Sequence, residues 1–377
     1  MIYLDNCSTT HTKPKCVIRA IKKGLTSLNY NPGRAGYSKA IEANMEVLKL
    51  RESACRLFNC NDPSNVIITK GCTESLNIAL RSNVKQNGHI ISTIFEHNSV
   101  LRTLEHLKNT YNIGYTLLTP NKEGKIEPNA ISSNIKDNTY MVVINHISNV
   151  TGTKQDIMSI GQICKTHNLI FVVDGAQSAG HTDLDMTNMN INFLAIAGHK
   201  GTLGPQGIGL LLCNKATPKP LLYGGTGTFS SDITQPTDLP EGIESGTMSI
   251  SNIMGLHAGI EYVHKHSQRI HSKINNLTHY LMLELSKIPN IKIYSPKDSI
   301  GVVSINVNNL TSNELSIALD QYKILTRSGL HCAPKVHEFY NTLDTGMTRI
   351  GLSHYNTTRH IKKLIKVLKE VSKKSIN

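Results

Sequence analysis

Reactive side chains stand directly after short apolar runs in this 377-residue sequence. Asp174 ends the run LIFVVD, and a carboxylate there needs a partner, because burying an unpaired charge is costly. A cationic heterocyclic nitrogen would be one such partner, and Gln177 could reach the same ligand. Lys200 follows FLAIA and a Gly-His pair; a partly desolvated lysine has a lowered pKa and can form a Schiff base with a carbonyl compound. A helix cap at Asp174 and a surface turn at Lys200 are the alternatives.

Three further motifs could contact a phosphorylated, planar ligand. TKGCTES, residues 69–75, places Cys72 and Thr73 where a helix is expected to begin, and free backbone N–H groups at such a point suit a phosphate. His97 in IFEHNSV could stack on a ring or move protons. Asn149 in HISNVTG could donate to a ligand hydroxyl. The alternatives are an ordinary helix cap, a histidine at a helix start and a turn residue.

The segment RSGLHCAP, residues 327–334, places Cys332 beside His331 and near Arg327. A basic, glycine-rich setting favours an exposed thiolate, which suits nucleophilic chemistry, whereas the alternative is a buried thiol in a loop. None of the eight cysteines forms a CxxC pair or has zinc spacing with histidine. We therefore predict free thiols and no metal site.

The elements that must position these residues alternate between strand and helix over about residues 65–213. This pattern predicts a mostly parallel sheet with helices on both faces and a ligand site at the carboxyl ends of the strands. A long helical pattern over about 252–287 then leads to short strands and to helices near 312–321 and 357–373. We predict a large domain over residues 15–255 and a small α+β domain formed by residues 1–14 and 256–377.

Composition excludes several classes of protein. Apolar runs along the chain exclude disorder, and the absence of a Gly-X-Y period or a self-similar unit excludes collagen-like and repeat proteins. No apolar stretch has the length of a membrane span and the start MIYLDNCSTT lacks a signal-peptide pattern, so we expect a cytoplasmic protein without membrane contacts. We attribute the net charge of +13 to lysines on the solvated surface, and not to a nucleic-acid-binding site, because no basic run is interleaved with aromatic residues.

Taken in order, the motifs EH, SNVTG, VDGAQ, GHK, GPQG, SGT and HCAP resemble those of the class V, fold-type I pyridoxal-phosphate enzymes, in particular the cysteine desulfurase and selenocysteine lyase group. The resemblance covers residues 3–357, and RSGLHCAP is similar to the type II desulfurases. It implies an α/β fold of the fold-type I transferases, with a mostly parallel central sheet in a large domain and a smaller α+β domain. It also implies a homodimer.

The resemblance assigns roles to the quoted residues. Lys200 would bind the aldehyde of pyridoxal 5'-phosphate and move the substrate Cα proton, while Asp174 would pair with the pyridine nitrogen. Cys332 would be the acceptor nucleophile, and Arg349 would hold the substrate carboxylate. The remaining implied contacts are ring stacking by His97, contacts to the ring hydroxyl by Asn149 (also placed at the substrate) and Gln177, and phosphate contacts by Cys72, Thr73, His199 and, from a second subunit, Thr247.

The implied activity is removal of sulfur from L-cysteine, which yields L-alanine and a persulfide on Cys332. A thiol or an acceptor protein would take the sulfur onward, for example to iron–sulfur clusters. A selenocysteine lyase acting on L-selenocysteine and a class V aminotransferase relative are the alternatives; a scaffold without catalysis is disfavoured by the intact reactive residues. The sequence departs from the family pattern at Ala197, where a hydroxyl residue is usual, and at Cys7 and Ser8, where two alanines are more common.

Overall fold

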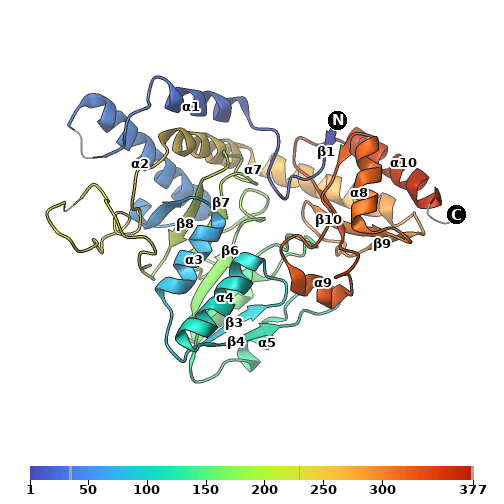
Figure 1. The fold of residues 1–377 in the computed structure, drawn as a ribbon, viewed down its shortest axis with the longest axis horizontal. Helices are drawn as coiled ribbons and strands as arrows, with labels where there is room; N and C mark the ends of the chain where they lie inside the picture. Colours follow the sequence, from blue (N-terminus) through green and yellow to red (C-terminus); the bar gives the residue numbers. More distant parts are fainter. Residues whose placement is uncertain (34–35, 229, 375–377) are drawn as a thin grey trace.

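The computed structural model describes residues 1–33, 36–228 and 230–374, and its centre is a seven-stranded sheet in the order β2-β8-β7-β6-β5-β3-β4 (Figure 1). Only β8 runs antiparallel to its neighbours, so the prediction of a mostly parallel sheet is confirmed. The strands are β2 (Val66–Thr69), β3 (His89–Thr93), β4 (Gly114–Leu118), β5 (Thr139–Asn145), β6 (Ile170–Asp174), β7 (Phe193–Ala197) and β8 (Gly209–Cys213).

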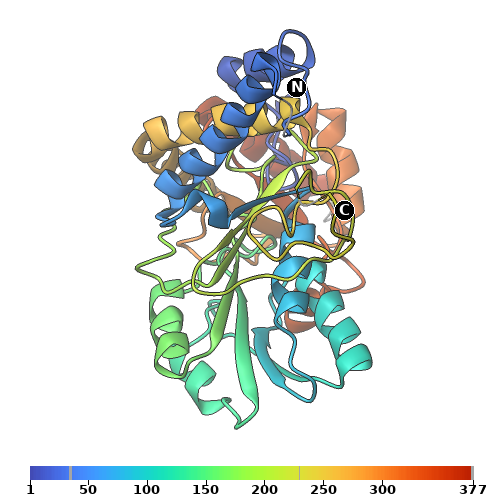
Figure 2. The ribbon, with the colours of Figure 1, turned by 90° about the vertical axis from the view of Figure 1, so that its left-hand side faces the viewer.

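Helices cover both faces of this sheet (Figure 2). Successive side chains of a strand point to opposite faces. Accordingly Val142 and Ile144 of β5 join one core, and Met141 and Val143 join the other. The first core is covered by α2 (Ser38–Phe58), α5 (Pro128–Ser133), α6 (Ile157–Thr166) and the first half of α7 (Ile250–Leu285), and the second by α3 (Cys72–Ser82) and α4 (Asn98–Tyr111).

A second, smaller body follows along the chain. Its antiparallel sheet has the order β12-β10-β9, from Thr348–Gly351, Val302–Val307 and Ile291–Ile293. The N-terminal strand β1 (Ile2–Tyr3) pairs with β11 (Ile324–Leu325), which brings the start of the chain to this body. The other elements are α1 (Lys15–Leu25), which packs along α7, the short 3-10 helix η1 (Pro63–Asn65), α8 (Ser312–Gln321), α9 (Pro334–Tyr340) and α10 (Thr358–Lys374).

Helix α7 belongs to both bodies. Its first half, with Ile253 and Leu256, packs in a core of the large sheet, and its second half, with Leu277 and Leu281, packs in the core of the small body. His266 has non-helical backbone angles and marks a kink between the halves. The predicted domain boundary at 255/256 therefore falls inside one helix and stays a prediction, and the last three residues of the predicted small domain lie outside the described residues.

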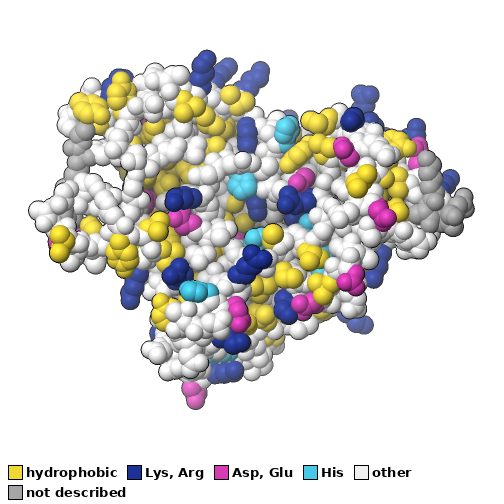
Figure 3. All heavy atoms as spheres, in the orientation of Figure 1, with side chains coloured by type: hydrophobic (Ala, Val, Ile, Leu, Met, Phe, Trp, Pro, Cys, Tyr) yellow, Lys and Arg dark blue, Asp and Glu magenta, His cyan; other side chains and the backbone are white. Residues whose placement is uncertain are grey.

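On the face drawn in Figure 3, lysine and arginine side chains are spread over both halves of the molecule and alternate with acidic ones. None of the helices in the described ranges combines the length and the apolar character that crossing a bilayer requires.

Candidate active site

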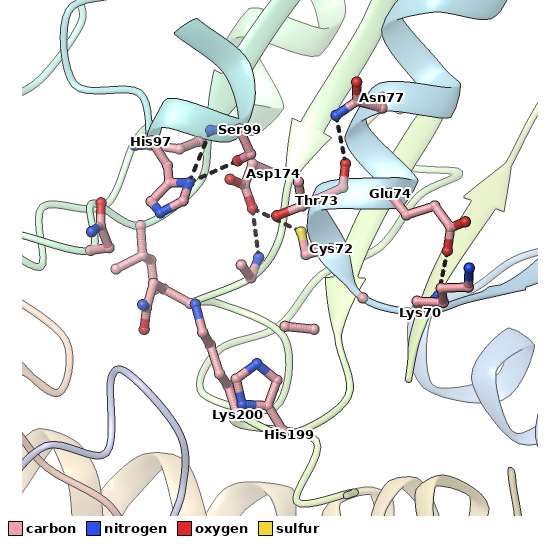
Figure 4. Close-up of a pocket in the computed structure, with 17 residues that line it drawn as sticks. Lys70, Cys72, Thr73, Glu74, Asn77, His97, Ser99, Asp174, His199 and Lys200 are labelled. Atoms are coloured by element: carbon pink, nitrogen blue, oxygen red, sulfur yellow. Dashed lines mark hydrogen bonds between the residues drawn. The ribbon is translucent and has the colours of Figure 1, made fainter. Parts of the chain in front are cut away.

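A cavity of about 450 Å³ lies at the carboxyl edge of the large sheet (Figure 4). Its walls are the segments that follow β2, β3, β5, β6 and β7, as expected for a parallel sheet, where ligands bind beyond the carboxyl ends of the strands. These motifs, which lie far apart in the sequence, meet at one cavity. The predicted residues that line the cavity are Cys72, Thr73, His97, Asn149, Asp174, Gln177, His199 and Lys200, together with Ala197.

One wall is the N-terminus of α3. Gly71 precedes the helix, and among the described residues no side chain caps its first N–H groups, so the simple capping alternative does not apply here. The carboxylate of Glu74 accepts instead from the N–H of Lys70. Across the cavity, burial lowers the pKa of His199 to about 4, and its Nδ1 is buried without a hydrogen-bond partner in the described part of the chain. These groups offer neutral donors and a helix dipole to an anion.

Asp174 is the last residue of β6 and is buried. Its Oδ1 accepts from the N–H of Ala176 at 2.9 Å and from Sγ of Cys72 at 3.4 Å. Burial raises the pKa of the Cys72 thiol well above its usual value, so the thiol is neutral and serves as the donor. Among the residues described, no donor contacts Oδ2 of Asp174, which leaves that oxygen for a cationic ligand.

Lys200 extends from the loop after β7 toward Asp174 and His97 (Figure 4). Burial lowers the pKa of its amine, against the attraction of Asp174, so a larger share of the amine is neutral and nucleophilic than in water. The N-terminal segment holds this loop: Oγ1 of Thr10 donates to the Lys200 carbonyl at 2.9 Å, and Nζ of Lys13 donates to the His199 carbonyl at 2.9 Å. The lysine is thus fixed by a segment nearly two hundred positions away.

His97 caps α4, because its Nδ1 accepts from the N–H of Ser99 at 3.1 Å. Burial is the main cause that lowers the pKa of His97, so its ring is neutral at neutral pH and can lie against a planar ligand.

The preceding residue, Glu96, is a buried carboxyl group beside the cavity that the sequence analysis did not name. Its Oε1 accepts from Oγ1 of Thr93 at 2.7 Å and from the N–H of Asn145 at 3.1 Å, and burial raises its pKa to about 8.

Cys332 and Arg349 lie at the edge of the cavity rather than in its lining. The Cys332 carbonyl accepts from the N–H of Asn98 at 2.7 Å, and the His331 carbonyl accepts from Nδ2 of Asn149 at 2.7 Å. Both His331 and Cys332 have positive φ, 51° and 56°, a strained conformation that recurs at functional sites. The loop from the small body is therefore held on the wall of the cavity, with the Cys332 side chain exposed.

The guanidinium of Arg349 is buried, and three of its five N–H groups donate hydrogen bonds within the described part of the chain. Nη1 donates to the Asn149 carbonyl at 2.9 Å, and Nη2 donates to Oδ1 of Asp5 at 3.1 Å and to Oγ of Ser8 at 2.8 Å. Ser8 also accepts from Nη1 of Arg327 at 3.2 Å and donates to Asp5 at 2.7 Å. Ser8, one of the three residues that depart from the family pattern, is therefore tied directly to this arginine pair.

The other departures and Thr247 occupy different positions. Cys7 is buried, and its carbonyl accepts from Nε2 of Gln177 at 2.9 Å, so the substitution leaves the backbone contact in place. Ala197 lines the cavity and contributes no hydroxyl. Thr247 is exposed and lines two neighbouring cavities instead of this one. Its predicted contact from a second subunit stays a prediction.

Several lining residues were not predicted, although most flank predicted ones: Lys70, Glu74, Asn77, Ser99, Asn145, Ile147 and Ala176. Glu96 had a readable signal, since it is a carboxylate directly after an apolar strand, as Asp174 is. Within the ranges that the structure describes, no three His, Cys, Asp or Glu side chains are grouped to hold a metal ion.

Comparison with known proteins gives consistent results. The model of the family "Aminotransferase class-V" matches residues 2–364. A protein of Methanothermobacter thermautotrophicus named "Probable cysteine desulfurase" is 32% identical over 98% of this chain and 94% of its own length. A "Cysteine desulfurase" of Wigglesworthia glossinidia brevipalpis is 31% identical over 99% of this chain and 93% of its own length. The apo structure of a cysteine desulfurase from Thermococcus onnurineus superposes with a TM-score of 0.92 at 30% identity, over 99% of this chain and 94% of that one.

Proposed function

The chain belongs to the aminotransferase class-V family, and we propose that it is a cysteine desulfurase, which takes sulfur from L-cysteine and releases L-alanine. The observation that carries the proposal is one cavity that joins an amine, a carboxylate and an imidazole, with a thiol at its edge. These are Lys200, Asp174, His97 and Cys332. A transferase of amino groups alone would have no use for the thiol.

Pyridoxal 5'-phosphate is the cofactor that membership of this family implies, and the cavity offers groups that suit it. The uncapped start of α3 and the unpartnered Nδ1 of His199 suit its phosphate. Oδ1 of Asn149, buried and without a partner among the described residues, suits a ring hydroxyl. An unpaired buried polar atom is costly, which supports the view that these atoms serve a bound molecule.

The other contacts follow from charge. Asp174 would pair with a protonated ring nitrogen, His97 would lie against the ring, and the Lys200 amine would hold the aldehyde carbon. When bound, the cofactor supplies an electron sink that stabilises negative charge at the substrate Cα.

The chain's own residues then carry out three tasks. Arg349 would hold the substrate carboxylate through its Nε–H, which is buried and has no partner among the described residues. The Lys200 amine, with its lowered pKa, would take the Cα proton. The Cys332 thiolate would attack the substrate sulfur: an S–S bond forms, the C–S bond breaks, and its electron pair stays with carbon, which takes up a proton. L-cysteine is thereby converted to L-alanine, and its sulfur remains on Cys332 as a persulfide.

The persulfide would next pass to a thiol or to an acceptor protein. The exposed position of Cys332 in a loop, rather than deep in the cavity, supports transfer to a second molecule. L-selenocysteine fits the same steps, because selenium would take the place of the attacked sulfur. The choice between the two substrates is an outcome of the experiment below.

We further propose a homodimer. Exposed apolar side chains recur at helical spacing from Tyr37 along α2, and two more lie in the segment before Thr247. Exposed apolar surface of this kind is typical of an interface. Sedimentation at twice the chain mass would support a dimer, whereas a monomer would leave Thr247 without its proposed role. The exposed apolar side chains that we propose to lie in the dimer interface are Tyr37, Ile41, Met45, Leu48, Leu222 and Tyr223.

The test of the function is product release from L-cysteine with added thiol. The native chain should release alanine and sulfide in equal amounts. Cys332→Ser should abolish both products while it keeps the visible absorbance of the bound cofactor, and Lys200→Ala should lose that absorbance. Cys16→Ser, at the other exposed cysteine, is the matched control and should turn over normally.

Full turnover by Cys332→Ser would refute the nucleophile. Pyruvate or a keto acid in place of alanine would refute desulfuration in favour of elimination or transamination. A much higher rate with L-selenocysteine than with L-cysteine would identify a lyase for the selenium amino acid.

A further inference from the structure

Three cysteines gather on the side of the large sheet away from the cavity. Cys55 lies in the last turn of α2, Cys60 follows the end of that helix, and Cys213 ends β8. The register of β2 and β8 pairs Thr69 with Gly209 at the cavity edge, so Cys213 stands at the opposite edge. None of the three sulfurs lines the cavity.

The helix end brings two of these thiols together. Asn59 adopts the left-handed conformation, with φ 51°, and the N–H of Cys60 donates to the Cys55 carbonyl at 3.1 Å. This hydrogen bond is the closing contact of the Schellman motif, in which the side chains three residues before the helix end and two residues after it commonly touch. Here both of those side chains are cysteines.

The surroundings make the two thiols unequal. Cys55 is buried, whereas Cys60 is partly exposed, and its Sγ lies 3.6 Å from the Asp62 carbonyl and 3.9 Å from the Cys213 carbonyl. The neighbouring Cys55 thiol lowers the pKa of Cys60, while the Cys60 thiol and burial raise the pKa of Cys55. The pair thus has one partly exposed thiol, whose pKa is lowered, and one buried thiol beside it, which is the arrangement of attacking and resolving thiols.

We infer that Cys55 and Cys60 form a reversible thiol–disulfide site that reacts with small-molecule disulfides. The Cys60 thiolate attacks one sulfur of the small disulfide, breaks its S–S bond and expels one thiolate. Cys55 then gives its proton to solvent and attacks the Cys60 sulfur, so that the protein disulfide forms and the second thiolate leaves. Two electrons pass from the protein to the small molecule, and two small thiols are released.

This site is independent of the proposed desulfurase chemistry. A disulfide would close a ring across the helix end, and so fix the turn that leads from α2 into η1 and β2. Because the pair lies away from Lys200 and Cys332, its variants should turn over L-cysteine as the native chain does. A failure of the desulfurase proposal would leave this inference standing, and the reverse also holds.

The experiment incubates the full-length protein with oxidised glutathione and maps its disulfides by mass spectrometry. The expected product has lost two hydrogens per chain, contains a Cys55–Cys60 link, releases two glutathiones and returns to the dithiol with a reductant. In a second measurement, iodoacetamide at neutral pH should label Cys60 before Cys55.

Variants sharpen the test. Cys55→Ser should stop at a mixed disulfide on Cys60, and Cys60→Ser should remain reduced at Cys55. Cys213→Ser and Cys16→Ser are the matched controls and should form the link normally. A Cys60–Cys213 link, a stable mixed disulfide on Cys60 of the native chain, or no loss of hydrogens would overturn the inference; the mapping on the native chain decides this even if a variant does not fold.

Discussion

Glu96→Gln is expected to remove a pH-dependent loss of stability that the native carboxyl group causes. The side chain is fully buried, and burial raises its pKa from the usual 4.5 to about 8. Oε1 accepts two hydrogen bonds, whereas Oε2 has no partner among the described residues, so the carboxyl group is best accommodated in its protonated form. Glutamine keeps the accepting oxygen and stays neutral at every pH.

The sign and size of the effect follow from proton binding. Between pH 4.5 and about 8 the folded chain holds a proton on Glu96 that the unfolded chain has released. The carboxyl group's contribution to the free energy of unfolding is therefore complete below pH 4.5 and is lost as the pH rises toward 8. The loss is about 1.4 kcal/mol per pH unit, or about 5 kcal/mol over the whole interval.

Urea unfolding of both chains across this pH range measures the prediction. The two free energies of unfolding should be similar near pH 4.5 and should diverge in favour of Glu96→Gln as the pH rises. Glu52→Gln, at an exposed position, is the matched control for the loss of one acidic side chain. A difference that does not change with pH, or that favours the native chain at high pH, would show that Glu96 is ionised in the folded protein and would refute the reasoning.

Three other substitutions test separate parts of the structure. Ser8→Ala removes a hydrogen-bond acceptor from the buried Arg349, the residue proposed to bind the substrate carboxylate. The loss of about 1 kcal/mol of hydrogen bonding should raise KM for L-cysteine by about fivefold. An unchanged KM would contradict this. Thr311→Ala breaks the capping box with Glu314 and should lower the free energy of unfolding by about 1 kcal/mol; no change would mean that the cap is not formed in solution. Leu194→Ala empties a fully buried position of β7 and should cost about 2–5 kcal/mol by the same measurement, and a cost below that range would indicate that the core closes over the space.

The central sheet and most of the cavity were predictable because their signals are local. Apolar runs alternating with helical spacing indicate parallel strands, and polar residues directly after those runs must meet at one edge. Asp174 and Lys200 were found in this way, and both line the cavity. Glu96 carries the same signal, because it is a carboxylate that directly follows an apolar strand.

Other features depend on contacts that no local pattern contains. Helix α2 carries small and apolar residues at helical spacing on its buried face, but the sequence analysis did not predict it. Ser8 reaches Arg349 only because β1 pairs with β11. The contact between Cys55 and Cys60 arises from the left-handed residue that ends α2, which the sequence does not specify.

Sequence alone determined the alternation of strands and helices in the central sheet, the convergence of reactive residues at its carboxyl edge, and the kinds of chemistry that those residues support. These depend on chain neighbours within one strand and the turn after it. Tertiary structure decided which residues from the small body reach the cavity, which carbonyls hold the Cys332 loop, and which ionisable groups are buried. The reason is physical: hydrogen bonds across hundreds of residues and the loss of water around a carboxyl group or an amine exist only once the bodies have packed together.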